Sequence, residues 1–235
     1  MAAPRRFALI PAAGTGMRFG GDIPKQYASL AGATLLRRSI DALNDAIVLE
    51  AIFVVLAPDD KLYAERVGKV RGVEALYCGG PTRAESVKNG LAAMVGRAEA
   101  EDWVLVHDAV RPCVDVSTLN RLLHELEDEP VGGLLAVPLA DTLKRAETGA
   151  GLRAMSTESR DGLWCAQTPQ MFRFAILQHA FRKADLAKIT DEAQAVEALG
   201  VRPRLVQGSP SNIKVTYPDD VALAETILGR RRKGA

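Results

Sequence analysis

A glycine-rich loop that contains Arg18 and is followed by Lys25 is the part of the sequence best suited to chemistry. Glycine lets backbone N–H groups approach a polyanion without interference from a Cβ atom. Arginine offers a fork of donors to phosphate oxygens, and lysine offers a point charge. The loop is therefore predicted to hold a triphosphate. It begins with proline and small residues, namely Pro11, Ala12, Ala13, Gly14, Thr15 and Gly16.

The spacing of the glycines separates this loop from two other phosphate-binding loops. The dinucleotide fingerprint would need glycine where Phe19 stands, which argues against an NAD(P)-binding domain. A Walker A loop would need Gly-Lys-Ser/Thr, whereas Gly21 precedes Asp22. An ordinary glycine-rich turn is the alternative for the loop alone, but basic residues at both ends favour phosphate binding.

A second chemical group, Asp108, follows the apolar run that begins at Trp103. Hard cations such as Mg²⁺ take oxygen ligands and bridge the phosphates of a nucleotide, so Asp108 is a candidate magnesium ligand. A turn or helix-capping role is the alternative for Asp108 by itself. His107 is interpreted as a structural or orienting residue, because no second histidine stands at zinc-ligand spacing.

Composition narrows the class of protein. The chain has 235 residues, 48% of them hydrophobic and 25% charged, as in a soluble globular protein. A net charge of +1 gives no general field for nucleic acid or membranes, and the basic run 230–233 is interpreted as a frayed, solvated C-terminus. Three cysteines without C-x-x-C spacing indicate reduced thiols and a cytoplasmic protein. No apolar run reaches the length of a membrane span.

The elements that must position these residues alternate between strands and helices. Apolar runs predict strands at 7–10, 51–57, 103–107, 133–137 and 204–206. Helices are predicted at 117–126 with Ser117 as N-cap, at 191–199 ending before Gly200, and at 219–228. This order predicts an α/β fold, a Rossmann-like, mostly parallel twisted sheet flanked by helices, with ligands beyond the carboxyl ends of the strands.

Residues 140–163 break this pattern, because they have no sustained apolar face and are crowded with charged residues and glycines. A structureless segment of this length is unusual inside a compact domain. From the residues alone, a disordered surface loop is the preferred interpretation.

A series of short motifs, in one order, gives the chain a resemblance to a known family. From Pro11 to about Glu225 it resembles the 2-C-methyl-D-erythritol 4-phosphate cytidylyltransferases of the non-mevalonate isoprenoid pathway, within the nucleotidyltransferase superfamily. Besides the loop, the motifs lie at 79–87, 106–112, 141–145, 162–164, 167–170, 190–192 and 212–216.

The resemblance implies an enzyme that transfers CMP from CTP to 2-C-methyl-D-erythritol 4-phosphate and releases pyrophosphate, by in-line attack assisted by Mg²⁺. It implies one domain over residues 1–235 and makes 140–163 a β-hairpin arm that embraces a second subunit in a homodimer. Lys214 is expected in a short strand. The implied catalytic residues are Arg18, Lys25, Lys214 and Arg160.

The binding residues follow from the same resemblance. CTP is expected on the loop residues 11–16 and on Gly79, Gly80, Ser86, Asp108 and Ala109; the substrate phosphate is expected on Asp108, Arg111, Thr142, Arg160, Thr168 and Lys214. Backbone groups of the glycine pair can approach the edge of a base, but Pro81 directly after it has no N–H to donate. The preference for CTP over other nucleotides is therefore left open.

Two alternative functions remain at this point. A ribitol 5-phosphate cytidylyltransferase would share the loop and the arm. A non-catalytic sugar-nucleotide-binding subunit would share the fold, although such proteins tend to lose catalytic cations, whereas Arg18, Lys25 and Lys214 are present.

Overall fold

The computed structural model describes residues 3–14, 19, 23–147, 149 and 151–233, with only the backbone for 232–233. Seven strands of this part form one sheet in the order β11-β7-β10-β6-β1-β4-β5. All neighbouring pairs are parallel except the two that involve β10. The predicted α/β class is confirmed. The strands are β1 (Arg6–Pro11), β4 (Ala51–Val55), β5 (Val73–Leu76), β6 (Trp103–Val106), β7 (Gly132–Pro138), β10 (Trp164–Arg173) and β11 (Arg204–Gln207).

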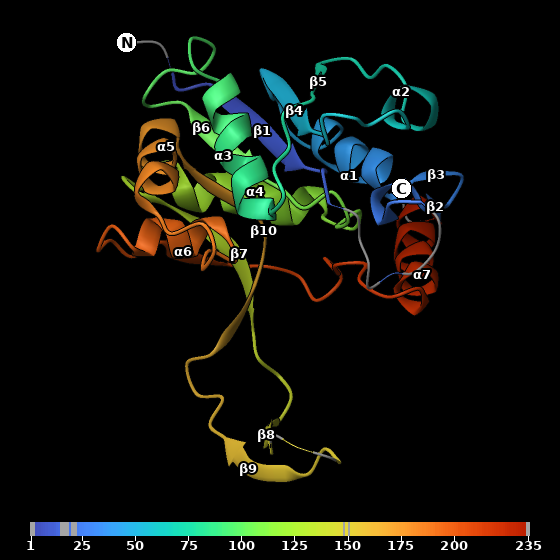
Figure 1. Cartoon of the computed structure of the whole chain (residues 1–235), viewed down its shortest axis with the longest axis vertical. Coiled ribbons are helices and arrows are strands. Elements are labelled where there is room, and N and C mark those ends of the chain that lie inside the picture. The colour runs from blue at the N-terminus through green and yellow to red at the C-terminus, as the bar shows by residue number, and fades with distance from the viewer. Residues whose placement is uncertain (1–2, 15–18, 20–22, 148, 150, 234–235) are drawn as a thin grey trace.

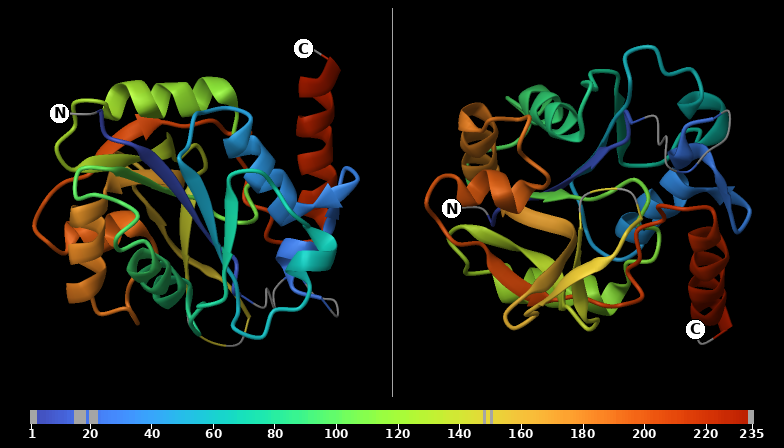
Figure 2. Two further views of the ribbon diagram at one scale, coloured as in Figure 1. Left: turned by 90° about the horizontal axis from the view of Figure 1, so that it is seen from above. Right: turned by 60° about the horizontal axis from the view of Figure 1, so that its bottom comes forward.

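Helices cover both faces of the sheet (Figure 2). Successive residues of a strand point to opposite faces, so Ile10 of β1 packs in one core cluster while Leu9 packs in the other. This is why the central strands are apolar without alternation. The first cluster includes α1 (Leu35–Asn44) and α4 (Val116–Leu126); the second includes α3 (Arg83–Ala93), α5 (Phe174–Lys183) and α6 (Glu192–Glu197).

The helix boundaries correct one prediction. Helix α4 is capped by Asp115, whose carboxylate accepts a hydrogen bond of 2.8 Å from the backbone N–H of Thr118, so the predicted N-cap Ser117 is wrong. An aspartate three residues ahead of a free N–H is as good a cap as serine. The predicted start of α6 is confirmed, with Asp191 as N-cap, and the chain turns at Gly200 with a φ of 82°.

A third, smaller cluster fixes the C-terminal part of the chain. Helix α7 (Asp219–Lys233) packs through Ala224 against Leu30 and Val215. The remaining short elements are η2 (Lys25–Tyr27), β2 (Ser29–Leu30), β3 (Ala33–Thr34) and α2 (Tyr63–Arg66), of which α2 packs in the first cluster through Tyr63. The solvated C-terminus predicted from the basic run is wrong for Arg231, which donates 2.8 and 3.2 Å hydrogen bonds to the carbonyls of Cys113 and Val114.

The segment between β7 and β10 extends far from the body (Figure 1). Its distal part is an antiparallel pair of strands, β8 (Leu143–Ala146) and β9 (Ala154–Glu158), as the family resemblance implied and unlike the disordered loop preferred from the residues alone. Leu152 and Met155 are 87% and 59% exposed there. None of the described helices is long and apolar enough to cross a membrane.

Candidate active site

A cavity of about 210 Å³ opens where β1 and β6 end, beside the N-terminus of α3. This is the edge at which open α/β sheets bind ligands. The structure brings ten of the predicted residues together there: Pro11, Ala12, Ala13, Gly14, Lys25, Gly80, Ser86, Asp108, Ala109 and Lys214. The predicted residues Thr15, Gly16 and Arg18 lie outside the described residues.

The two glycines of the pair pack too closely against their neighbours to carry side chains, Gly79 against the loop that follows β1 and Gly80 against α3. A Cβ atom on Gly79 would stand 2.2 Å from the Cβ of Ala13, and one on Gly80 would stand 2.4 Å from the Cβ of Glu85. The N–H of Gly79 donates to the carbonyl of Leu56 at 2.8 Å. Gly80 lines the cavity and Gly79 does not, but a side chain on either residue would displace its neighbours.

Ser86, which also lines the cavity, holds Gly80 in place. Its hydroxyl oxygen accepts from the N–H of Gly80 at 3.1 Å, and the carbonyl of Thr82 lies 3.0 Å away as an acceptor. Thr82 caps α3 in a reciprocal arrangement with Glu85. Ser86 thus holds the 80–82 turn on α3, while its predicted contact with a base stays a prediction.

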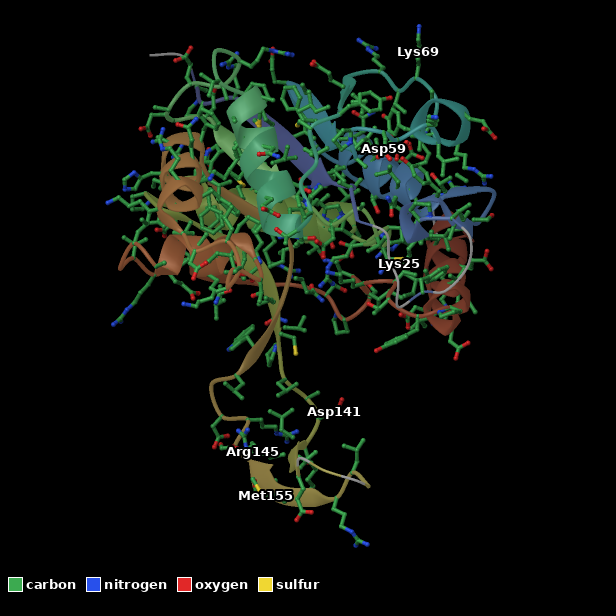
Figure 3. The ribbon with its side chains drawn as sticks, viewed as in Figure 1. Lys25, Asp59, Lys69, Asp141, Arg145 and Met155 are labelled. Atoms are coloured by element: carbon green, nitrogen blue, oxygen red, sulfur yellow. The ribbon has the colours of Figure 1, made fainter. Side chains whose placement is uncertain are left out.

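Lys25 lies on the body, well separated from Asp141 and Arg145 on the arm (Figure 3). The next residue, Gln26, is buried and donates from its amide to the carbonyl of Ala12 at 2.7 Å. This hydrogen bond ties η2 to the loop that follows β1. It places the start of η2, and with it Lys25, on the wall of the cavity.

Asp108 is the centre of a charged cluster. Its Oδ1 lies 3.1 Å from Nε of Arg83, and its Oδ2 lies 2.9 Å from Nζ of Lys214 and 3.4 Å from Nε of Arg111. Arg83 in turn makes a two-pronged contact, at 2.7 and 3.1 Å, with the carboxylate of Glu192. Three cations and two carboxylates leave the cluster one net positive charge, which suits an anionic ligand.

The protonation state of Asp108 follows from these neighbours. Burial opposes ionisation, but the attraction of Arg83, Lys214 and Arg111 outweighs it and holds the pKa of Asp108 far below its usual range. Asp108 is therefore an anion at neutral pH.

A buried relay fixes the backbone beneath Asp108. Nε2 of His107 lies 3.0 Å from the carbonyl of Arg111, which can only accept, so Nε2 carries the proton. Nδ1 then accepts from the hydroxyl of Thr168 at 3.0 Å, and that hydroxyl accepts from the N–H of Asp108 at 3.0 Å. Burial lowers the pKa of His107 to about 4, so the ring is neutral. The orienting interpretation of His107 agrees with this geometry.

This relay occupies the hydroxyl of Thr168, which the resemblance assigned to the substrate phosphate. Its one proton points to His107. A phosphate contact from Thr168 would have to replace that hydrogen bond. The geometry gives Thr168 a role in orienting Asp108.

Lys214 lies in an irregular segment, so the short strand expected there is wrong. The segment is held by the N–H of Val215, which donates to the carbonyl of Val110 at 2.9 Å, and by Arg111, which donates to the carbonyl of Asn212 at 2.7 Å. These bonds link it to the loop after β6. They bring Lys214 to Asp108 without the hydrogen bonds of a β-sheet.

A second cavity of about 180 Å³ adjoins the first and shares Arg83, Asp108 and Lys214 with it. Arg111 and Thr168, both predicted to bind the substrate phosphate, line it. The other two, Thr142 and Arg160, do not: they lie on the exposed arm, where Arg160 donates to the carbonyl of Ala140. The remaining residues that line the second cavity are Ala166, Gln167, Gln170, Thr190 and Asp191.

The donor set for a magnesium ion is small. The described residues contain no group of three or more His, Cys, Asp or Glu side chains that could hold a metal. Among those that line the first cavity, Asp108 is the one carboxylate. A single carboxylate fits Mg²⁺ that is held mainly by the phosphates of a nucleotide and by water.

Sequence reasoning missed Arg83 and Glu192 as parts of this site. Both lie in motifs that carried the resemblance, at 79–87 and 190–192. Their contact joins residues 109 positions apart, and no local pattern predicts such a pairing.

Comparisons with known proteins identify the family of this chain. Residues 7–230 match the family model described as 2-C-methyl-D-erythritol 4-phosphate cytidylyltransferase. Proteins of that name from Dechloromonas aromatica and Azoarcus are 52% and 50% identical over 97% of this chain, covering 100% and 96% of their own lengths.

Solved structures give the same result. A crystal structure of 4-diphosphocytidyl-2C-methyl-D-erythritol synthase has a TM-score of 0.85 at 39% identity, with 96% of this chain and 99% of the other covered. The Francisella tularensis 2-C-methyl-D-erythritol 4-phosphate cytidylyltransferase has a TM-score of 0.79 at 34% identity, covering 95% and 99%. This chain belongs to the 2-C-methyl-D-erythritol 4-phosphate cytidylyltransferase family.

Proposed function

We propose that this enzyme transfers CMP from CTP to 2-C-methyl-D-erythritol 4-phosphate, giving 4-diphosphocytidyl-2-C-methyl-D-erythritol and pyrophosphate. One observation carries the proposal beyond family membership: Lys25 and Lys214, from opposite ends of the chain, line one cavity with the glycine-rich loop. The adjoining cavity has room for a second phosphorylated ligand, and Asp108 and Lys214 belong to both.

The shared wall is where the two substrates would react. CTP occupies the first cavity and the polyol phosphate the second. An oxygen of the polyol phosphate forms a bond to the α-phosphorus of CTP, the bond from that phosphorus to the bridging oxygen breaks, and pyrophosphate leaves. The nucleophile is already an anion, so no general base is required, and positioning and electrostatics carry the reaction.

The cationic side chains have separate tasks in this mechanism. Lys214, between the cavities, donates to oxygens of both the α-phosphate and the attacking phosphate. Lys25 and the predicted Arg18 stabilise the charge that develops on the triphosphate. Asp108 orients Lys214 and, with the phosphates, would hold Mg²⁺. A bound Mg²⁺ would supply further neutralisation of phosphate charge.

We further propose that the enzyme is a homodimer in which the arm of one subunit completes the site of the other. Thr142 and Arg160 lie on the arm and line neither cavity of their own chain, so a role for them needs a second subunit. The exposed apolar side chains at Leu152 and Met155 are consistent with a partner surface.

Mixing two inactive variants tests this assembly. Lys214→Ala and Arg160→Ala homodimers would each be inactive. In mixed C2 dimers one site carries both changes and the other carries neither, so mixing should restore roughly a quarter of wild-type activity. No recovery after verified subunit exchange, or a monomer by sedimentation velocity, would refute completion in trans.

The proposed reaction is tested by pyrophosphate release from a panel of nucleotides and polyol phosphates, with and without Mg²⁺. We expect release with CTP, 2-C-methyl-D-erythritol 4-phosphate and Mg²⁺ together. Turnover of ribitol 5-phosphate alone would favour the ribitol enzyme, and binding of nucleotide without turnover of any acceptor would favour a non-catalytic subunit.

A cytoplasmic location also stays a proposal. It is consistent with the unpaired thiols of Cys78, Cys113 and Cys165.

A further inference from the structure

The Arg83–Glu192 pair has no place in the mechanism so far, yet Arg83 lines both cavities. The side chain of Glu192 is 0% exposed, and that of Arg83 is 28% exposed. Burying a carboxylate is costly, and a buried ion pair stabilises a fold little more than apolar side chains of the same volume would. Stability alone therefore does not account for a charged pair at this position.

The geometry shows what the pair does to Asp108. Arg83 contacts Oδ1 of Asp108, whereas Lys214 and Arg111 contact Oδ2. Opposite contacts on the two oxygens fix the rotation of the carboxylate. Glu192 engages both Nη atoms of Arg83, which leaves Nε directed at Asp108.

Glu192 is itself fixed by the strand that floors the site. The side chain of Gln170, in β10, accepts from the N–H of Ala193 at 2.8 Å and donates to the carboxylate of Asp191 at 3.0 Å. Asp191 caps α6. A continuous set of hydrogen bonds thus runs from β10 through the start of α6 and Arg83 to Asp108.

We propose that Arg83, clamped by Glu192, is a positioning residue that fixes the carboxylate of Asp108 and thereby the ammonium group of Lys214 between the two cavities. The inference rests on the proposed function. Glu192 and Asp108 also neutralise Arg83, so the phosphates meet Lys214 rather than a competing guanidinium. Loss of the clamp misplaces Lys214 during the transfer, which lowers kcat more than it raises the KM for CTP.

The test removes both charges together, because removing one would strand the other in the interior. The double variant Arg83→Met, Glu192→Gln keeps similar side-chain volumes. We expect its Tm to stay close to that of the wild type while kcat for pyrophosphate release falls at least about tenfold, since small misplacements of a reacting group are costly. The KM for CTP should change far less.

A matched control is Arg204→Met with Glu125→Gln, which removes an ion pair of 3.0 Å that lines neither cavity. Arg83→Lys is the second variant: lysine keeps a cation opposite Glu192 but lacks the planar fork that binds Glu192 through two nitrogens and Asp108 through a third. It should lose kcat similarly, and the control should not.

The outcomes are distinguishable. Wild-type kcat in the double variant or in Arg83→Lys would overturn this inference while the proposed function stands. A fall in kcat that matches the fall in folded protein would also overturn it. No pyrophosphate release by the wild type would overturn the proposed function and this inference together.

Discussion

Replacing Lys214 with alanine is the most direct test of the mechanism. Its Nζ atom lies 2.9 Å from Asp108, its side chain is 39% exposed, and it lines both cavities. Removing one preorganised donor to a developing negative charge costs about 3 kcal/mol, which corresponds to a fall of roughly a hundredfold in kcat. We expect at least this loss in Lys214→Ala.

The same change should leave the fold intact. Asp108 keeps Arg83 and Arg111 as partners, so no buried charge is stranded when Lys214 is removed. A partly exposed lysine–carboxylate pair contributes roughly 1 kcal/mol or less to stability. The expected change in Tm is therefore a few degrees at most. A large loss of activity with a small loss of stability is the signature of a role in the reaction.

The assay is pyrophosphate release at saturating CTP and 2-C-methyl-D-erythritol 4-phosphate, with thermal unfolding of the same preparations. Lys188→Ala is the control, because Lys188 also pairs with a carboxylate, at 3.1 Å, but is 80% exposed and lines neither cavity. A folded Lys214→Ala variant with kcat near that of the wild type would refute the reasoning.

Three further outcomes are expected. Gly79→Ala should weaken CTP binding at least about tenfold by calorimetry, because the new Cβ would meet Ala13 at 2.2 Å; Gly229→Ala, with open space around it, is the control, and equal affinities would contradict the close packing. Thr168→Val should lower the free energy of unfolding by about 2 kcal/mol in urea titrations, because it leaves the N–H of Asp108 and Nδ1 of His107 unpaired; Thr168→Ser should not. Burial lowers the pKa of His107 from 6.5 to about 4. Between these two pH values His107 binds a proton in the unfolded chain but not in the folded protein. The free energy of unfolding should therefore be unaffected by His107 above pH 6.5 and should fall by about 3 kcal/mol as the pH is lowered to 4. In urea titrations His107→Gln should lose less stability than the wild type over this pH range. An identical loss would contradict the buried neutral ring.

Sequence reasoning found the parts of the fold that depend on local patterns. The continuous apolar runs around Leu9 and Phe53 predict strands buried on both faces, and that is where β1 and β4 lie. Asp108 could be placed because it directly follows the last residue of such a run. These predictions need no knowledge of the rest of the chain.

The missed strand β10 shows where local patterns fail. It contains buried Gln167, Thr168 and Gln170, which serve the site and make the strand read as polar. The clamp on Asp108 was missed for a related reason, because Arg83 and Glu192 acquire a role only after α3 and α6 come together. Lys214 was expected in a strand, but its position depends on hydrogen bonds to the loop after β6.

Strand β10 connects the arm to the site, which constrains where the chain length can vary in this family. It begins at Trp164, where the arm joins the body, and lies between β7 and β6, with the hydroxyl of Thr168 accepting from the N–H of Asp108. The register of β10 against β7 shifts between Ala166 and Gln170, so Thr168 lies at an irregularity of the strand. Inserting or deleting one residue between the hairpin and this irregularity would displace Thr168 from Asp108. Evolutionary length changes should therefore collect at the hairpin tip, and the stretch that joins the hairpin to Thr168 should keep its residue count.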